Sequence, residues 1–125
     1  MGFHIDRREN CAILTVEAEK FDTKVAPAIK AQLVLLKNEG FRNIIINLRQ
    51  CRYCDSSGLS AILIANRICN ENNGTCVICH TQKAVEKLIE ISQLDTVLKI
   101  VPTLDEALQY INLEEVEKKI KNKKK

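Results

Sequence analysis

Long apolar runs are absent from this chain of 125 residues. No stretch approaches the roughly 20 apolar residues that a membrane-spanning helix needs. The first residues, Met1 to Asp6, have neither the basic region nor the apolar core of a secretory signal peptide. We therefore expect a cytoplasmic protein with no membrane span.

Linkers are also absent, because no Pro-, Gly- or Ser-rich segment divides the chain, which holds only two prolines and four glycines. Its length and its apolar content of 46% suffice for one hydrophobic core. We expect one domain over residues 1–112, followed over residues 113–125 by the end of a helix and a lysine-rich tail.

Acidic residues are missing from the last eight positions, which contain six lysines. Without those six, 13 basic residues face 16 acidic ones, so the formal charge of +3 becomes −3 for the body of the chain. A basic tail can attract nucleic acid or an anionic membrane, but no aromatic residue lies among the lysines to stack on bases. We expect a solvated, frayed helix end and no direct nucleic-acid partner.

The residues of a catalytic site are scarce. The only histidines are His4 and His80, and neither has sequence support as a base for Ser56 or Ser57. The chain contains no Gly-x-Ser-x-Gly motif, no Gly-rich dinucleotide loop and no P-loop. We therefore expect a protein that is not an enzyme and needs no cofactor.

Six cysteines are present, and two Cys-x-x-Cys pairs match the spacing of a zinc site: Cys51 with Cys54, and Cys76 with Cys79. The second pair lies in the apparent strand 75–80, where residues three apart point to opposite faces. Neither pair contains the glycine that eases a tight turn. We expect buried, reduced cysteines and no metal, with a zinc or thiol-redox module as the weaker alternative.

Hydrophobic periodicity predicts strands and helices in the order β-β-α-β-α-β-α-β-α. Strands alternating with helices imply parallel crossovers, and the opening hairpin adds an antiparallel pair. The predicted fold class is α/β, a mixed sheet with helices packed on it. The predicted strands are 3–6, 11–16, 43–48, 75–79 and 98–101, and the predicted helices begin near residues 22, 57, 83 and 103.

The stretch from Cys54 to Leu63 is a predicted strand-to-helix junction. Asp55, Ser56 and Ser57 supply N-cap oxygens, and Gly58 removes a side chain where the backbone is crowded. An exposed serine at this position can also be phosphorylated: free N–H groups and the helix dipole favour the phosphate, while Asp55 opposes it. The pattern alone leaves simple capping and modification both open. Similarly, Asp22 or Thr23 is expected to cap the first helix.

Several stretches together resemble the STAS domain family, and in particular bacterial anti-sigma factor antagonists, over roughly residues 3 to 111. The junction carries most of this resemblance, through the run Asp55-Ser56-Ser57-Gly58-Leu59-Ser60-Ala61-Ile62-Leu63. The other stretches are Phe21-Asp22-Thr23 with Ala26 and Leu33, the run from Gly40 to Leu48, the helix and its exit from Val85 to Asp95, and Asp105-Glu106-Ala107-Leu108.

The resemblance implies a mechanism. In this family the unphosphorylated antagonist binds an anti-sigma factor that is also a serine kinase, and a sigma factor is released. The kinase phosphorylates the serine directly after the Asp, here Ser56, and a PP2C-like phosphatase reverses the modification. The alternative is a non-switching subunit of a stressosome-like or membrane lipid or anion transport complex. The resemblance places partner contacts at Asp22, Thr23, Asp55, Ser56, Ser57 and Gly58.

Overall fold

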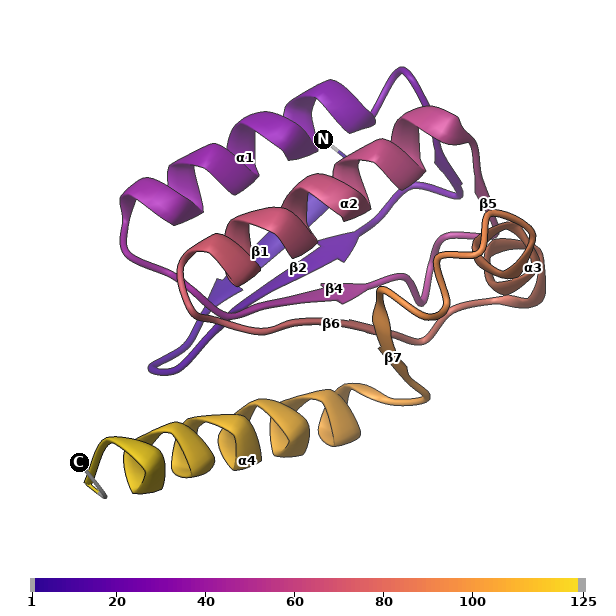
Figure 1. Ribbon diagram of the computed structural model, residues 1–125. Coiled ribbons are helices and arrows are strands. Elements are labelled where there is room, and N and C mark those ends of the chain that lie inside the picture. The colour runs from indigo at the N-terminus through magenta and orange to yellow at the C-terminus, as the bar shows by residue number, and fades with distance from the viewer. Residues whose placement is uncertain (1, 124–125) are drawn as a thin grey trace.

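A mixed sheet of five strands forms the centre of the computed structural model, which describes residues 2–123 (Figure 1). The spatial order is β1-β2-β4-β6-β7; β1 pairs antiparallel with β2, and the other neighbours are parallel. The predicted α/β class with a mixed sheet is confirmed. The strands are β1 (Phe3–Arg7), β2 (Ala12–Val16), β4 (Ile44–Asn47), β6 (Cys76–Cys79) and β7 (Lys99–Val101).

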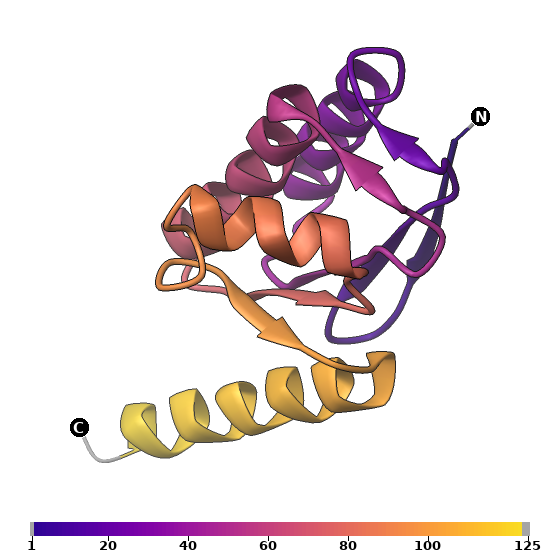
Figure 2. The same cartoon turned by 90° about the vertical axis from the view of Figure 1, so that its right-hand side faces the viewer.

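Helices cover both faces of this sheet, as Figures 1 and 2 show. Two of them lie side by side on one face, α1 (Ala26–Asn38) and α2 (Ser56–Glu71). A third, α3 (Lys83–Ile91), lies at the end of the sheet, and α4 (Leu104–Lys123) crosses the opposite face alone. None of the helices within residues 2–123 is long and apolar enough to cross a membrane. Residues 124 and 125 of the predicted tail lie outside the described residues, and the division at residue 112 stays a prediction.

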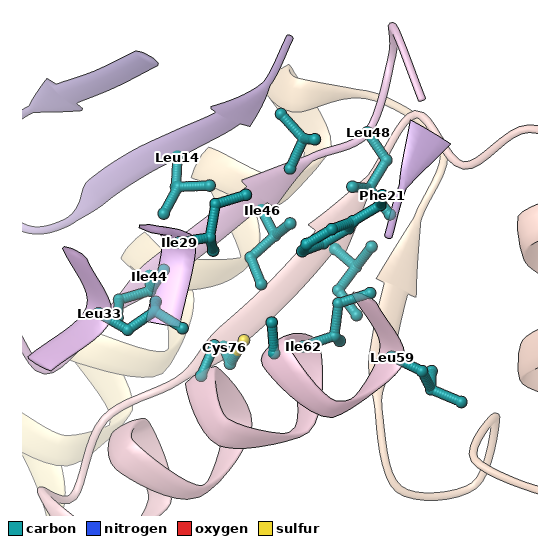
Figure 3. Packing of buried hydrophobic residues seen from close by; sticks show 14 of the residues in the cluster. Leu14, Phe21, Ile29, Leu33, Ile44, Ile46, Leu48, Leu59, Ile62 and Cys76 are labelled. Carbon is teal, nitrogen blue, oxygen red and sulfur yellow. The ribbon is translucent and has the colours of Figure 1, made fainter. Parts of the chain in front are cut away.

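The alternation of side chains along the strands creates two hydrophobic clusters. Ile44 and Ile46 point toward α1 and α2, into the larger cluster that Figure 3 shows. Ile45 lies on the other face, in a smaller cluster with Ala107 and Ile111 of α4. The continuous apolar run of β4 is therefore buried on both faces, as expected for a central strand.

The second Cys-x-x-Cys pair is split between the same two clusters. Cys76 belongs to the larger cluster and Cys79 to the smaller one, so their side chains lie on opposite faces of β6. This confirms the geometric argument against one ion bound by both thiols. Among residues 2–123, no group of three or more His, Cys, Asp or Glu side chains is placed to hold a metal ion.

A second, two-stranded sheet lies beside the main one. It pairs β3 (Lys20–Phe21) in parallel with β5 (Tyr53–Cys54), in two segments where the sequence analysis predicted no strand. That prediction was wrong, because strands of two residues are too short to show a periodicity. Phe21 is fully buried and fixes this small sheet to the larger cluster.

The helix starts differ from the prediction in one case. Neither Asp22 nor Thr23 caps α1, which begins only at Ala26 with Pro27 in its first turn, as expected for that proline. The Asp22 carboxylate instead accepts a hydrogen bond from the Lys24 N–H at 3.0 Å, closing a turn ahead of the helix. The start of α4 has the expected cap, because Thr103 Oγ1 accepts from the Glu106 N–H at 3.2 Å.

Candidate functional site

Pairing between β3 and β5 brings two distant parts of the chain together. Phe21 lies opposite Cys54 in this ladder, so Asp22 and Asp55, which follow them, leave the small sheet at the same edge. The Asp55 N–H donates to the Phe21 carbonyl at 3.2 Å. Figure 2 shows the two short strands next to each other, with β5 leading into α2. The structure thus brings together the two acidic residues that the resemblance assigned to one surface.

The cap of α2 is Asp55. One carboxylate oxygen accepts hydrogen bonds from the N–H groups of Ser57, at 2.8 Å, and Gly58, at 3.1 Å. Ser57 is therefore not the cap, as we had allowed, but a half-buried residue of the first turn. The expectation that a phosphate would meet free N–H groups also needs correction, because Asp55 already occupies two of them.

Gly58 is required by a close approach between α2 and β3. A Cβ atom at this position would lie 2.3 Å from the Phe21 carbonyl oxygen and 2.8 Å from Cys54 Sγ. Both distances are well inside van der Waals contact, so any larger residue forces the start of α2 away from the small sheet. Gly58 therefore positions Ser56 and Asp55 without being exposed itself.

The exposure of the predicted residues divides them by role. Thr23, Asp55 and Ser56 are exposed, and Asp22 and Ser57 are half-buried. Ser56 is the first residue of α2, so its hydroxyl lies at the positive end of the helix dipole and next to the Asp55 carboxylate. Of this set, Ser56 is the hydroxyl most accessible to a modifying enzyme at the helix start.

A hollow of about 220 Å³ adjoins these residues. The sequence analysis missed two of its lining residues, Lys20 and the half-exposed Tyr53. Both lie on the two-residue strands, and only recognition of that small sheet would have revealed them. Tyrosine is enriched in the cores of protein interfaces, whereas lysine and carboxylates are more usual at their polar rims. The other lining residues are Phe21, Asp22, Cys54 and Asp55.

The thiol of Cys54, which lines this hollow, is not activated as a nucleophile. Burial raises the pKa of Cys54 to about 12, and the neighbouring Cys51 and Asp55 add to the effect. The thiol is therefore protonated at neutral pH and is a poor nucleophile.

The two histidines lie elsewhere in the fold. His80 Nε2 accepts a hydrogen bond from the Leu104 N–H at 3.1 Å at the start of α4, and His4 is an exposed residue of β1. The arrangement presents an exposed serine, Ser56, beside a shallow hollow.

These features define a small α/β domain with an exposed serine at a helix start. The chain belongs to the STAS domain family, whose model matches residues 3–107. It is 24% identical over 118 residues to the anti-sigma F factor antagonist of Paenibacillus polymyxa, covering 93% of this chain and 98% of that protein.

Solved structures share the fold. An anti-sigma factor antagonist from Mycobacterium paratuberculosis superposes with a TM-score of 0.78 at 19% identity, over 88% of this chain and 92% of that one. The antagonist SpoIIAA in its unphosphorylated form gives a TM-score of 0.76 at 19% identity, over 88% and 96% of the two chains. The phosphorylated form of SpoIIAA, from Bacillus, gives 0.70 at 19% identity, over 87% and 98%.

Proposed function

We propose that this protein is an anti-sigma factor antagonist switched by phosphorylation of Ser56. The unphosphorylated form binds an anti-sigma factor that is also a serine kinase, which releases a sigma factor in the cytoplasm. A PP2C-like phosphatase restores the active form. The observation that supports the proposal most directly is the position of Ser56, exposed at the start of α2 beside Asp55 and near Asp22.

Charge explains why the modification would act as a switch. A phosphoserine adds between about −1.5 and −2 charges at neutral pH. The Asp55 carboxylate already accepts from the N–H groups of Ser57 and Gly58, so the phosphate competes with it for the helix start and otherwise faces solvent. An interface formed around Ser56 would then have to accept a new dianion beside a carboxylate. Such a mismatch can weaken binding by several kcal/mol.

The other predicted residues have supporting roles in this proposal. Asp55 and Thr23 are exposed and contact the kinase directly, together with the half-buried Asp22. Ser57 and Gly58 hold the helix start in place. Lys20 and Tyr53, which line the hollow next to Asp22 and Asp55, extend the contact surface.

Phosphosite mapping tests the assignment. The protein is incubated with its kinase and ATP, digested, and analysed by mass spectrometry, alongside the Ser56→Ala and Ser57→Ala variants. We expect one phosphate on Ser56, none on the Ser56→Ala protein, and normal phosphorylation of Ser57→Ala. Phosphate on a different residue contradicts the assignment. A completely unmodified Ser56 favours the non-switching subunit of a larger assembly.

A further inference from the structure

The second half of α4 carries exposed apolar side chains on its outer surface. Leu113 is 63% exposed, Val116 52% and Ile120 50%. Their spacing of three and four residues places them on one side of the helix. Ala107 and Ile111, which pack against the sheet, lie on the other side. In Figures 1 and 2 no other element covers the side of α4 that faces away from the sheet.

The position of α4 on the domain is fixed by polar contacts of its inner side. Arg42 Nη2 donates to Glu115 Oε1 at 2.5 Å, and Lys118 Nζ donates to the Asn73 carbonyl at 2.6 Å. These contacts lie within the same stretch of helix as Leu113, Val116 and Ile120. The outer apolar side chains are therefore held on a docked helix that presents them to solvent.

The charges around the exposed stripe change sign along α4. Exposed acidic residues Asp105 and Glu106 lie near its start, exposed Glu117 adjoins the stripe, and exposed lysines Lys119 and Lys121 lie near its end. The opposite charges of the two ends complement each other when a second copy of the helix runs in the opposite direction. A parallel pair would instead place Glu106 beside Glu106 and Lys121 beside Lys121.

We propose that α4 pairs antiparallel with α4 of a second copy of this chain, making a two-fold symmetric dimer. In the register that brings the opposite charges together, Leu113 of each copy packs against Val116 of the other, and Ile120 packs against Gln109. Glu106 then lies on the same flank as Lys121 of the other copy, twice by symmetry. Isologous contacts of this kind form closed dimers.

The size of the contact sets its strength. A contact between one pair of helices buries less accessible surface than the roughly 1,200 Å² of a stable interface. An interface of this size gives a weak association. We expect dissociation constants of about 10 µM to 1 mM. The contact lies on the face of the sheet opposite α1 and α2, so Ser56 stays accessible in both copies. The dimer would present two switch sites at once.

Sedimentation velocity of the full chain from about 10 µM to 1 mM tests this proposal, in the concentration range expected from the contact size. We expect a reversible monomer–dimer equilibrium that Leu113→Glu and Val116→Glu abolish. The matched control is Val34→Glu on α1, where the valine is also 50% exposed and the equilibrium should not change. Circular dichroism verifies that each variant is folded.

Charge reversal tests the direction of the helices. Lys121→Glu should weaken the dimer by about 3- to 10-fold at low salt, as expected for two exposed ion pairs. The double variant Glu106→Lys with Lys121→Glu should restore it. A monomer at all concentrations, or a dimer indifferent to Leu113→Glu, overturns the proposal. So does a double variant that stays as weak as Lys121→Glu. A protein that stays monomeric but binds vesicles containing phosphatidylserine would assign the stripe to a lipid surface instead.

Discussion

Replacing Gly58 should directly disturb the packing between the start of α2 and the small sheet. Alanine is favoured over glycine inside a helix by about 1 kcal/mol, yet here its Cβ would overlap the Phe21 carbonyl. We expect Gly58→Ala to lower the free energy of unfolding by about 1 to 3 kcal/mol, the usual cost of overpacking. Urea unfolding followed by circular dichroism measures this.

The matched control for Gly58→Ala is Ser60→Ala, in the same helix at a half-buried position. This change should leave the free energy of unfolding nearly unchanged or slightly higher, because alanine is the better helix former. A Gly58→Ala protein as stable as the Ser60→Ala protein would show that the start of α2 can move without cost.

The cysteines are predicted to act as packed thiols. Five of the six are buried, and burial raises the pKa of Cys79 to about 11, so its thiolate is disfavoured at neutral pH. We expect protein purified without chelator to contain far less than one zinc per chain. Chelator should leave its thermal unfolding midpoint unchanged. Stoichiometric zinc, lost on Cys51→Ala together with thermal stability, would revive the metal-site alternative.

Among the elements, the pair β3 and β5 matters most for the site. Each strand has only two residues, yet their pairing places Asp22 and Asp55 at one edge. The sequence analysis identified both aspartates by resemblance but had no structural reason for their proximity. Pairing between segments so far apart depends on the tertiary position of Phe21, which no local pattern encodes.

The docking of α4 against the rest of the domain depends on the ion pair between Arg42 and Glu115. Burial raises the pKa of Glu115, but Arg42, by hydrogen bond and charge, together with Asn43 and Lys118 holds the pKa below its usual value. We expect Arg42→Ala to lower the free energy of unfolding by about 1 kcal/mol, because Arg42 is partly exposed. Hydrogen exchange should rise in the second half of α4.

The effect of Arg42→Ala should depend on pH. A depressed carboxyl pKa stabilises the folded state above the pKa of the unfolded chain, and this stabilisation is lost as pH falls through the folded pKa. The difference in free energy of unfolding between the wild-type and Arg42→Ala proteins should therefore shrink below about pH 4.5, the ordinary pKa of a glutamate. Arg7→Ala, which breaks the exposed pair with Glu39, is the matched control and should leave hydrogen exchange in α4 unchanged. A difference that persists in acid contradicts this role for the pair.

At the scale of the whole molecule, the sequence predicted most of the architecture. Strong periodicity identified the four helices and the strands of the main sheet, because long amphipathic segments carry that signal themselves. We expected the end of a helix and a lysine-rich tail over residues 113–125, and in the described part of the chain α4 continues to Lys123. Leu113, Val116 and Ile120 continue its periodicity on the outer side, where no core within the chain explains them.

The sequence analysis predicted the local structure around the candidate site residues only in part. The junction motif and the exposure of Ser56 agree with the expectation from sequence. The sequence analysis did not separate the roles of Asp55 and Ser57, because each of three adjacent polar side chains can cap a helix. The backbone angles decide which one does, and in the structure it is Asp55. The domain therefore combines a helix start capped by Asp55 with an exposed serine, Ser56.

The measurement that tests the central claim most directly is the affinity of the proposed partner, an anti-sigma factor with kinase activity, for this protein with and without phosphate on Ser56. Isothermal titration should give tight binding of the unmodified protein, and binding weaker by about 100-fold or more for the phosphorylated protein, from a mismatch of several kcal/mol. Ser56→Ala should bind like the unmodified protein and Ser56→Asp more weakly. Equal affinity of the phosphorylated and unmodified proteins would contradict the switch.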